Sequence, residues 1–160
     1  MNKITAIVLA AGSGSRMKSK TKKQFLEIKG KPVIWYSLFE FEKSRVDEII
    51  LVTGKEDIDY CKKEIVEKYN LKKIKNVVAG GSERYESVYN GLKEVTGNIV
   101  LIHDGARPLI NNEIIERSIE GTIKSDACVV GVPVKDTIKR ANKEVLKAHM
   151  THCVHDAVNS

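Results

Sequence analysis

The chain has 160 residues, a formal net charge of +6 at pH 7, and a composition that is 42% hydrophobic but only 6% aromatic. This length predicts one domain with a substantial core and is too short for two domains. The positive charge favours an anionic partner, but the few aromatic residues are not interleaved with the basic clusters, so a nucleic-acid partner is not expected.

The N-terminal run Ile4–Ala11, which follows Lys3, superficially resembles a secretion signal. It is short, and a basic glycine-rich segment stands where a cleavage region would be, so we interpret it as a strand. No apolar run is long enough to span a bilayer, and we expect no membrane partner. The cysteines Cys61, Cys128 and Cys153 are odd in number and lack the spacing of a disulfide framework, which predicts a reducing, cytoplasmic location.

Apolar runs typical of strands alternate with segments that suit helices. The predicted strands are Ile4–Leu9, Glu48–Thr53, Lys75–Ala79, Asn98–His103 and Ala127–Val132. The predicted helices include Pro32–Lys43, Glu56–Tyr69 and Asn111–Lys124. This alternation predicts an α/β fold, a single Rossmann-like nucleotide-binding domain with a mostly parallel sheet flanked by helices.

The first predicted strand is followed by the sequence AAGSGSRM at residues 10–17 and, shortly after it, by Lys23. Gly12 and Gly14 let the backbone turn with its N–H groups facing inward, and such a concave row of amides binds anions. Arg16 adds a planar fork of donors, and Lys23 adds a mobile positive charge. This loop therefore predicts a site for a nucleotide triphosphate.

Two better-known glycine motifs do not fit this loop. A Walker loop requires a lysine at a position where this sequence has none, and a dinucleotide fingerprint requires a third glycine where Met17 stands. An ordinary glycine turn between strand and helix remains the alternative. The basic residues crowded into positions 16–23 favour a bound anion, because like charges repel one another unless something anionic lies among them.

Ligands of open α/β sheets gather beyond the carboxyl ends of the strands, so the residues after the third predicted strand are candidates for binding. Gly80 and Gly81 would let a base approach the backbone, and Ser82 is predicted to cap the following helix. A glycine turn with a cap explains these three residues without a ligand. It leaves Arg84 and Ser87 without a role.

An aspartate, Asp104, follows the fourth predicted strand. A carboxylate there can hold Mg²⁺ through one or two oxygens while the metal keeps waters and binds phosphate. Alternatively, it caps the next turn and pairs with Arg107, which is the favoured interpretation of the aspartate taken alone. Beside a phosphate loop the metal role is preferred. We expect His103 to be packed or hydrogen-bonded, because no partner lies at metal-ligand spacing from it.

These motifs, in this order, resemble those of the 2-C-methyl-D-erythritol 4-phosphate cytidylyltransferase family from Ile4 to about Arg140. The matching sequences are AAGSGSRM, KQF, GGSERYESV, HDGARP and VPVKDTIK. Ribitol-5-phosphate cytidylyltransferases share the glycine loop and the KQ pair, but HDGARP and PVKDT look closer to the methylerythritol family. The resemblance implies a nucleotidyltransferase domain over residues 1–140 that is incomplete relative to the family.

The resemblance implies transfer of a cytidylyl group from CTP to methylerythritol phosphate with release of pyrophosphate, in isoprenoid precursor synthesis, by a homodimer. By motif position it implies a catalytic role for Arg16 and Lys23, nucleotide binding by Ala10, Ala11, Gly80, Gly81 and Ser87, Mg²⁺ binding by Asp104, and contact with the polyol phosphate by Arg107 and Thr137. Such a transfer depends on positioning and on positive charge, so it needs no side-chain nucleophile.

One departure from the family pattern lies beside a proposed catalytic residue. The family usually has proline before the KQ pair, whereas this chain has Lys22. A rigid turn is lost and a charge is gained, which leaves the pose of Lys23 open.

A second departure lies at the end of the chain. The family continues beyond Arg140 through an arm that helps form the dimer, a QTPQ segment and a late lysine, whereas this chain ends at Ser160. Residues 141–160 are predicted to be a divergent, poorly ordered tail. Disorder is favoured over metal binding by its candidate ligands, which are His149, His152, Cys153, His155 and Asp156. We expect CTP binding with weak turnover, and the alternative is a non-catalytic CTP-binding fragment.

Overall fold

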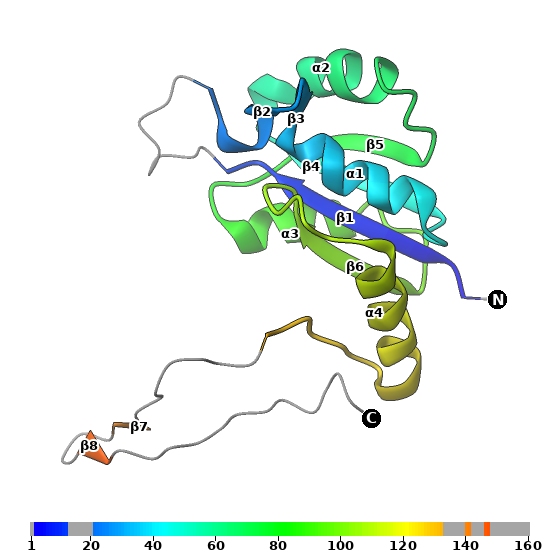
Figure 1. The fold of residues 1–160 in the computed structure, drawn as a ribbon, viewed down its shortest axis with the longest axis vertical. Helices are drawn as coiled ribbons and strands as arrows, with labels where there is room; N and C mark the ends of the chain where they lie inside the picture. The colour runs from blue at the N-terminus through cyan, green and yellow to red at the C-terminus, as the bar shows by residue number, and fades with distance from the viewer. Residues whose placement is uncertain (1, 13–20, 133–139, 142–145, 148–160) are drawn as a thin grey trace.

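The computed structural model describes residues 2–12, 21–132, 140–141 and 146–147. Its centre is a sheet of four parallel strands in the order β5-β4-β1-β6 (Figure 1). These strands are β1 (Ile4–Ala10), β4 (Glu48–Thr53), β5 (Ile74–Ala79) and β6 (Ile99–Asp104). The first four predicted strands and the parallel α/β architecture are confirmed.

The other described elements are helices, single turns and two short hairpins. In chain order they are η1 (Lys23–Phe25), β2 (Glu27–Ile28), β3 (Lys31–Pro32), α1 (Val33–Lys43), η2 (Lys55–Asp57), α2 (Ile58–Tyr60), η3 (Cys61–Glu67), α3 (Arg84–Leu92), α4 (Asn112–Ser125), β7 (Arg140–Ala141) and β8 (Leu146–Lys147). The predicted helices over 32–43 and 111–124 are confirmed as α1 and α4. The helix predicted over 56–69 forms as three consecutive pieces, η2, α2 and the π-helical η3.

Helices cover both faces of the sheet (Figure 1). On one face, apolar side chains of α1, η3 and α4, including Ile34, Ile65 and Ile119, join a core cluster with β1 and β4. On the other face α3 lies close to the strands, because Gly91 has no side chain. A Cβ atom at Gly91 would lie 2.8 Å from Cγ2 of Ile7, so this close packing requires glycine.

The order of the strands creates a reversal beside β1. The chain moves from β1 outward to β4 and β5, and α3 then carries it back to β6 on the opposite side of β1. Ala10 is in register with Thr53, and Leu9 is in register with Asp104. The carboxyl ends of β1, β4 and β6 therefore lie side by side at the point where ligands bind in open α/β sheets.

The fifth predicted strand, Ala127–Val132, is wrong. This segment has no strand pairing among the residues that the structure describes, and it follows α4 outside the sheet (Figure 1). Val129 is 75% exposed and Val132 is 87% exposed. An apolar, β-branched run becomes a strand only when a partner supplies hydrogen bonds, and the run itself does not encode that partner.

Several predictions about the whole chain lie partly outside the described residues. Within the tail over 141–160 only Ala141 and β8 are described, so its predicted disorder and its candidate metal ligands stay predictions. Cys61 and Cys128 carry free thiols. Among the described residues, no helix has the length and apolar character needed to cross a bilayer.

Glu48 has a buried carboxylate at the start of β4. Its side chain contacts residues at the start of β1 and in the loop before β6. It is 4% exposed and accepts hydrogen bonds from the hydroxyl groups of Thr5 and Thr96, each at 2.8 Å. Nζ of Lys3 lies 2.8 Å from the same carboxylate. Burial alone would raise the pKa of Glu48, but these donors outweigh burial and hold its pKa well below the usual range.

Replacing Glu48 with glutamine should lower the free energy of unfolding at neutral pH by about 1–3 kcal/mol, because the amide keeps the volume but loses charge-assisted hydrogen bonds. Since the pKa of Glu48 is lower in the folded than in the unfolded protein, this stabilisation is present above the unfolded pKa of about 4.3 and is lost as the pH falls below it. Denaturant titrations of both proteins from neutral to acidic pH measure the difference.

Glu64→Gln is a suitable control, because Glu64 is half-buried and, among the described residues, its one ion pair is with exposed Lys68 at 3.4 Å. Its effect should stay within about 0.5 kcal/mol. A stability difference between wild type and Glu48→Gln that does not shrink in acid would contradict the assignment.

Candidate functional site

A hollow of about 530 Å³ lies at the reversal beside β1. Its lining comes from the end of β1, the turn η1, the start of α3 and the end of β6. The lining residues are Leu9, Ala10, Ala11, Gly12, Gln24, Gly81, Ser82, Glu83, Arg84, Ser87, Asp104 and Ala106. The structure thus brings together most of the predicted nucleotide-binding residues that it describes, and places them beside the predicted metal ligand.

Gly80 lies directly behind this lining and lets three backbone segments meet. Its N–H donates to the carbonyl of Thr53 at 2.8 Å, and the N–H of Gly81 donates to Oγ of Ser87 at 3.1 Å. A Cβ atom at Gly80 would lie 2.6 Å from Oγ of Ser87 and would also collide with the methyl group of Ala11. Only glycine permits this approach of the β5–α3 loop to the end of β1.

The predicted cap of α3 is wrong, because the N-cap residue is Glu83 rather than Ser82. The carboxylate of Glu86 reaches back over the first turn and accepts hydrogen bonds from N–H of Ser82 at 2.8 Å and from its hydroxyl group at 2.9 Å. These bonds lower the pKa of Glu86. A glutamate three residues into the helix is the usual partner in a capping box, so the sequence contained a signal that favoured Glu83.

Asp104, the last residue of β6, is held between two arginines. Nη2 of Arg84 lies 3.1 Å from Oδ1 of Asp104, and Nε of Arg107 lies 3.1 Å from Oδ2. The N–H of Arg107 also donates to the carbonyl of Asp104 at 2.9 Å. The structure therefore contains the turn and the Arg107 pairing of the alternative interpretation. It also gives Arg84, which sequence reasoning left without a role, a partner 20 residues away.

The metal prediction for Asp104 rests on the chemistry of a single carboxylate. Within the described parts of the chain, no cluster of three or more His, Cys, Asp or Glu side chains could hold a metal ion. Mg²⁺ does not require such a cluster, because it keeps several waters and takes further oxygens from substrate phosphates. A carboxylate at a strand end beside the hollow fits that requirement.

His103 is packed and hydrogen-bonded, as predicted. Its Nε2 lies 3.1 Å from the carbonyl oxygen of Arg107, and its ring meets Phe41 edge to face with centroids 5.4 Å apart. Burial lowers the pKa of His103. His103 therefore stabilises the turn after β6 through its contact with the carbonyl of Arg107.

Gln24 is a site residue to which sequence reasoning gave no role. Its side chain is buried, and Nε2 donates to the carbonyl of Ala10 at 2.6 Å and to that of Gly12 at 3.1 Å. It therefore fastens η1 to the end of β1. A polar side chain directly before Phe25 in an otherwise basic segment was a weak signal for this contact.

The structure describes only some of the residues predicted to act in catalysis or in binding the acceptor. Lys23 is exposed on η1, next to Gln24, and does not belong to the lining of the hollow. Arg107 is exposed and reaches the hollow through Asp104. Gly14, Arg16 and Thr137 lie outside the described residues.

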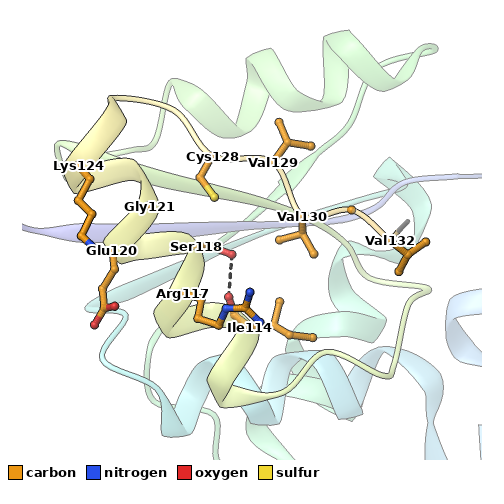
Figure 2. Close-up of a pocket in the computed structure, with 11 residues that line it drawn as sticks. Ile114, Arg117, Ser118, Glu120, Gly121, Lys124, Cys128, Val129, Val130 and Val132 are labelled. Atoms are coloured by element: carbon orange, nitrogen blue, oxygen red, sulfur yellow. Dashed lines mark hydrogen bonds between the residues drawn. The ribbon is translucent and has the colours of Figure 1, made fainter. Parts of the chain in front are cut away.

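A second hollow, of about 390 Å³, lies between α4 and residues 128–132 (Figure 2). Figure 2 shows Cys128 and Val130 facing the helix, where the hydroxyl group of Ser118 donates to the carbonyl of Ile114 at 2.7 Å. This hollow contains none of the strand ends. We assign the functional site to the first hollow, because the reversal of the sheet and the polar strand ends coincide there.

The fold is that of a Rossmann-like α/β protein, and its candidate site, the first hollow, lies at the carboxyl ends of parallel strands. The sequence model of the 2-C-methyl-D-erythritol 4-phosphate cytidylyltransferase family matches residues 4–154, which extends beyond the motifs that carried the resemblance. The chain belongs to this family.

Individual relatives show how much of the family's length is present. The 2-C-methyl-D-erythritol 4-phosphate cytidylyltransferase of Lachnoclostridium phytofermentans is 52% identical over 140 residues, which cover 87% of this chain and 60% of the relative. That of Clostridium acetobutylicum is 53% identical over 136 residues, covering 84% and 59% respectively. The crystal structure of 4-diphosphocytidyl-2C-methyl-D-erythritol synthase from Anaerococcus prevotii matches with a TM-score of 0.79 and 33% identity, over 94% of this chain and 64% of that one. The chain spans about 60% of the length of the curated relatives it matches.

Replacing Gly80 with alanine should lower the free energy of unfolding by about 1–3 kcal/mol, because the new methyl group forces Ala11 and Ser87 apart. Gly131→Ala is the matched control, since a Cβ atom there meets nothing within 4 Å. Denaturant unfolding of both variants measures the effect. Equal stability of Gly80→Ala and wild type would show that the loop is not in close contact with the end of β1.

Proposed function

We propose that this chain transfers a cytidylyl group from CTP to 2-C-methyl-D-erythritol 4-phosphate and releases pyrophosphate. The observation that carries the proposal is the hollow at the end of β1, where family motifs that are far apart in the sequence come together. Membership of the cytidylyltransferase family supports the same chemistry. The polyol phosphate supplies the nucleophile, and the protein supplies position and positive charge.

The cytosine and ribose of CTP occupy the space bounded by Ala10, Ala11, Gly80, Gly81 and Ser87. The small residues Ala10, Ala11 and Gly81 line the hollow and leave room for a flat base, and Gly80 packs behind them against Ala11 and Ser87. The N–H groups of Gly80 and Gly81 and the hydroxyl group of Ser87 already donate within the protein, so this edge of the site is rigid and selects a flat base by shape.

The triphosphate lies along the loop that contains Gly12 and Gly14, with Arg16 and Lys23 as its cations. As the acceptor phosphate attacks the α-phosphorus, the bond to the leaving pyrophosphate breaks and its negative charge grows. A guanidinium and an ammonium group beside that charge stabilise the transition state more than the ground state. Arg107 and Thr137 bind the polyol phosphate.

Asp104 would hold the Mg²⁺ ion. When bound, Mg²⁺ neutralises charge on the polyphosphate. Its binding would separate Asp104 from Arg84 and Arg107, which leaves both guanidinium groups available to phosphate oxygens. The two guanidinium groups compete with the metal for the carboxylate oxygens, so the assignment rests on the place of Asp104 in the lining of the hollow.

Assembly into a homodimer and a cytoplasmic location, both expected from the sequence, remain proposals. A homodimer accords with the family resemblance, and a reducing compartment accords with the free thiols of Cys61 and Cys128.

Two measurements on the purified chain test the function together. Pyrophosphate release from CTP and Mg²⁺ with methylerythritol phosphate should exceed release with ribitol 5-phosphate, and calorimetry should detect CTP binding. Binding without pyrophosphate release would favour the non-catalytic CTP-binding alternative, which the partial coverage of the relatives keeps open. A higher rate with ribitol 5-phosphate would overturn the choice of acceptor.

Lys23→Met should lower kcat about 10- to 100-fold with a smaller rise in KM, because Lys23 contacts charge that develops in the transition state. Steady-state kinetics of pyrophosphate release measure both constants. Lys62→Met, an exposed lysine on η3, is the charge-matched control and should leave both constants unchanged. A change confined to KM would reduce Lys23 to a substrate-binding residue.

A further inference from the structure

Lys22, the residue before η1, forms an ion pair with each of two carboxylates from a distant part of the chain. Its Nζ donates to Oε1 of Glu56 and to Oδ2 of Asp57, which both belong to η2, directly after β4. The side chain of Lys22 is only 22% exposed. Burial alone would lower the pKa of Lys22, but the two carboxylates outweigh burial and raise it, so the ammonium group stays charged. We call these two ion pairs the Lys22 clasp.

The β4–η2 loop is shaped to present both carboxylates. A Cβ atom at Gly54 would lie 2.7 Å from Oδ2 of Asp57 and 2.9 Å from Oε1 of Glu56. Both side chains therefore fold back over Gly54 and fill the space that a larger residue would need. The carboxylates are held toward Lys22 by the local backbone as well as by its charge.

The same turn is fastened at two further points. The carbonyl of Lys22 accepts a hydrogen bond from N–H of Phe25 at 2.9 Å, and the Phe25 ring meets Tyr60 with centroids 5.1 Å apart. On its other side Gln24 is hydrogen-bonded to the carbonyl oxygens of Ala10 and Gly12. The turn η1 thus connects the end of β1 to the segment after β4. Lys23 lies between Lys22 and Gln24, whose side chains make these contacts.

We propose that Lys22 is a positioning residue, whose clasp with Glu56 and Asp57 fixes η1 so that Lys23 starts from a defined point beside the nucleotide loop. This inference rests on the proposed function for its consequence in catalysis. The clasp itself does not depend on that function, because all three of its residues belong to this chain. Holding the base of a long side chain reduces the conformational freedom that Lys23 loses when it binds phosphate.

The competing explanation is that Lys22 is one more cation that attracts CTP directly. The two explanations predict opposite signs for removal of a carboxylate. If Lys22 acts through the clasp, Asp57→Asn loosens η1 and weakens CTP binding. If Lys22 acts by its charge, Asp57→Asn removes a negative charge from its neighbourhood and strengthens CTP binding.

The backbone of Lys22 offers a rescue that carries no charge. Its φ of −61° and ψ of 141° are those of an extended residue, and proline fixes φ near that value. Lys22→Pro therefore restores rigidity at the start of η1 without an ammonium group, whereas Lys22→Met removes the clasp and leaves the backbone free.

The clasp is tested first by hydrogen exchange in the nucleotide-free protein. Lys22→Met should raise the exchange rates of the Phe25 and Leu26 amides, which donate to carbonyls of this turn, by about 3- to 10-fold, and Lys22→Pro should keep them near the wild-type rates. Lys55→Met removes one charge from η2 outside the clasp and should change neither rate. Unchanged exchange in Lys22→Met would overturn the proposal, whether or not the protein binds CTP.

CTP calorimetry then tests the consequence. Lys22→Met and Asp57→Asn should each weaken binding by about 3- to 10-fold, Lys22→Pro should recover most of the loss, and Lys22→Met should add nothing in a Lys23→Met background. Tighter binding by Asp57→Asn, or equal losses from Lys22→Met with and without Lys23, would overturn a role through Lys23. Absence of CTP binding by the wild-type protein would instead count against the proposed function.

Discussion

The parallel pairing of β1 on both of its edges is the constraint on which the rest of the structure depends. β1 is joined to β4 on one side and to β6 on the other, and its residues are almost all buried. A strand in that position must be mainly apolar, and the one polar side chain of β1, Thr5, donates its hydroxyl group to Glu48. The polar residues of the site are then those at the carboxyl end of β1. The end of β6 and the start of α3 lie beside them.

Two features meet at the strand ends. The backbone is closely packed at Gly80, and the carboxylate of Asp104 is paired with two arginines. Gly80 brings the β5–α3 loop against Ala11 and Ser87, and the hydrogen bond from Gly81 to Ser87 holds the loop at the edge of the hollow. Asp104 forms ion pairs with both Arg84 and Arg107 at the end of β6. Because both ion pairs are partly exposed, each contributes little to stability, and their exchange for phosphate or a metal ion costs little.

Much of this arrangement was predictable from local sequence. β-branched runs predict four strands, and the spacing of Asp104 and Arg107 predicts their pairing within one turn. Contacts between distant residues could not be predicted in the same way, because nothing near Arg84 or Lys22 specifies a partner 20 or 34 residues away. The run Ala127–Val132 illustrates the same limit in reverse, since its composition suits a strand but the partner that would make it one is not encoded locally.

The central claim is that the end of β1, the start of α3 and the end of β6 form a binding site for a pyrimidine nucleotide. Titration of the isotope-labelled chain with CTP and Mg²⁺, followed by backbone amide NMR shifts, tests it most directly. The account predicts that the amides of Gly12, Gly81 and Ser87 shift together and saturate at one CTP concentration. Shifts confined to the hollow between α4 and residues 128–132, or no shifts in folded protein, would contradict it.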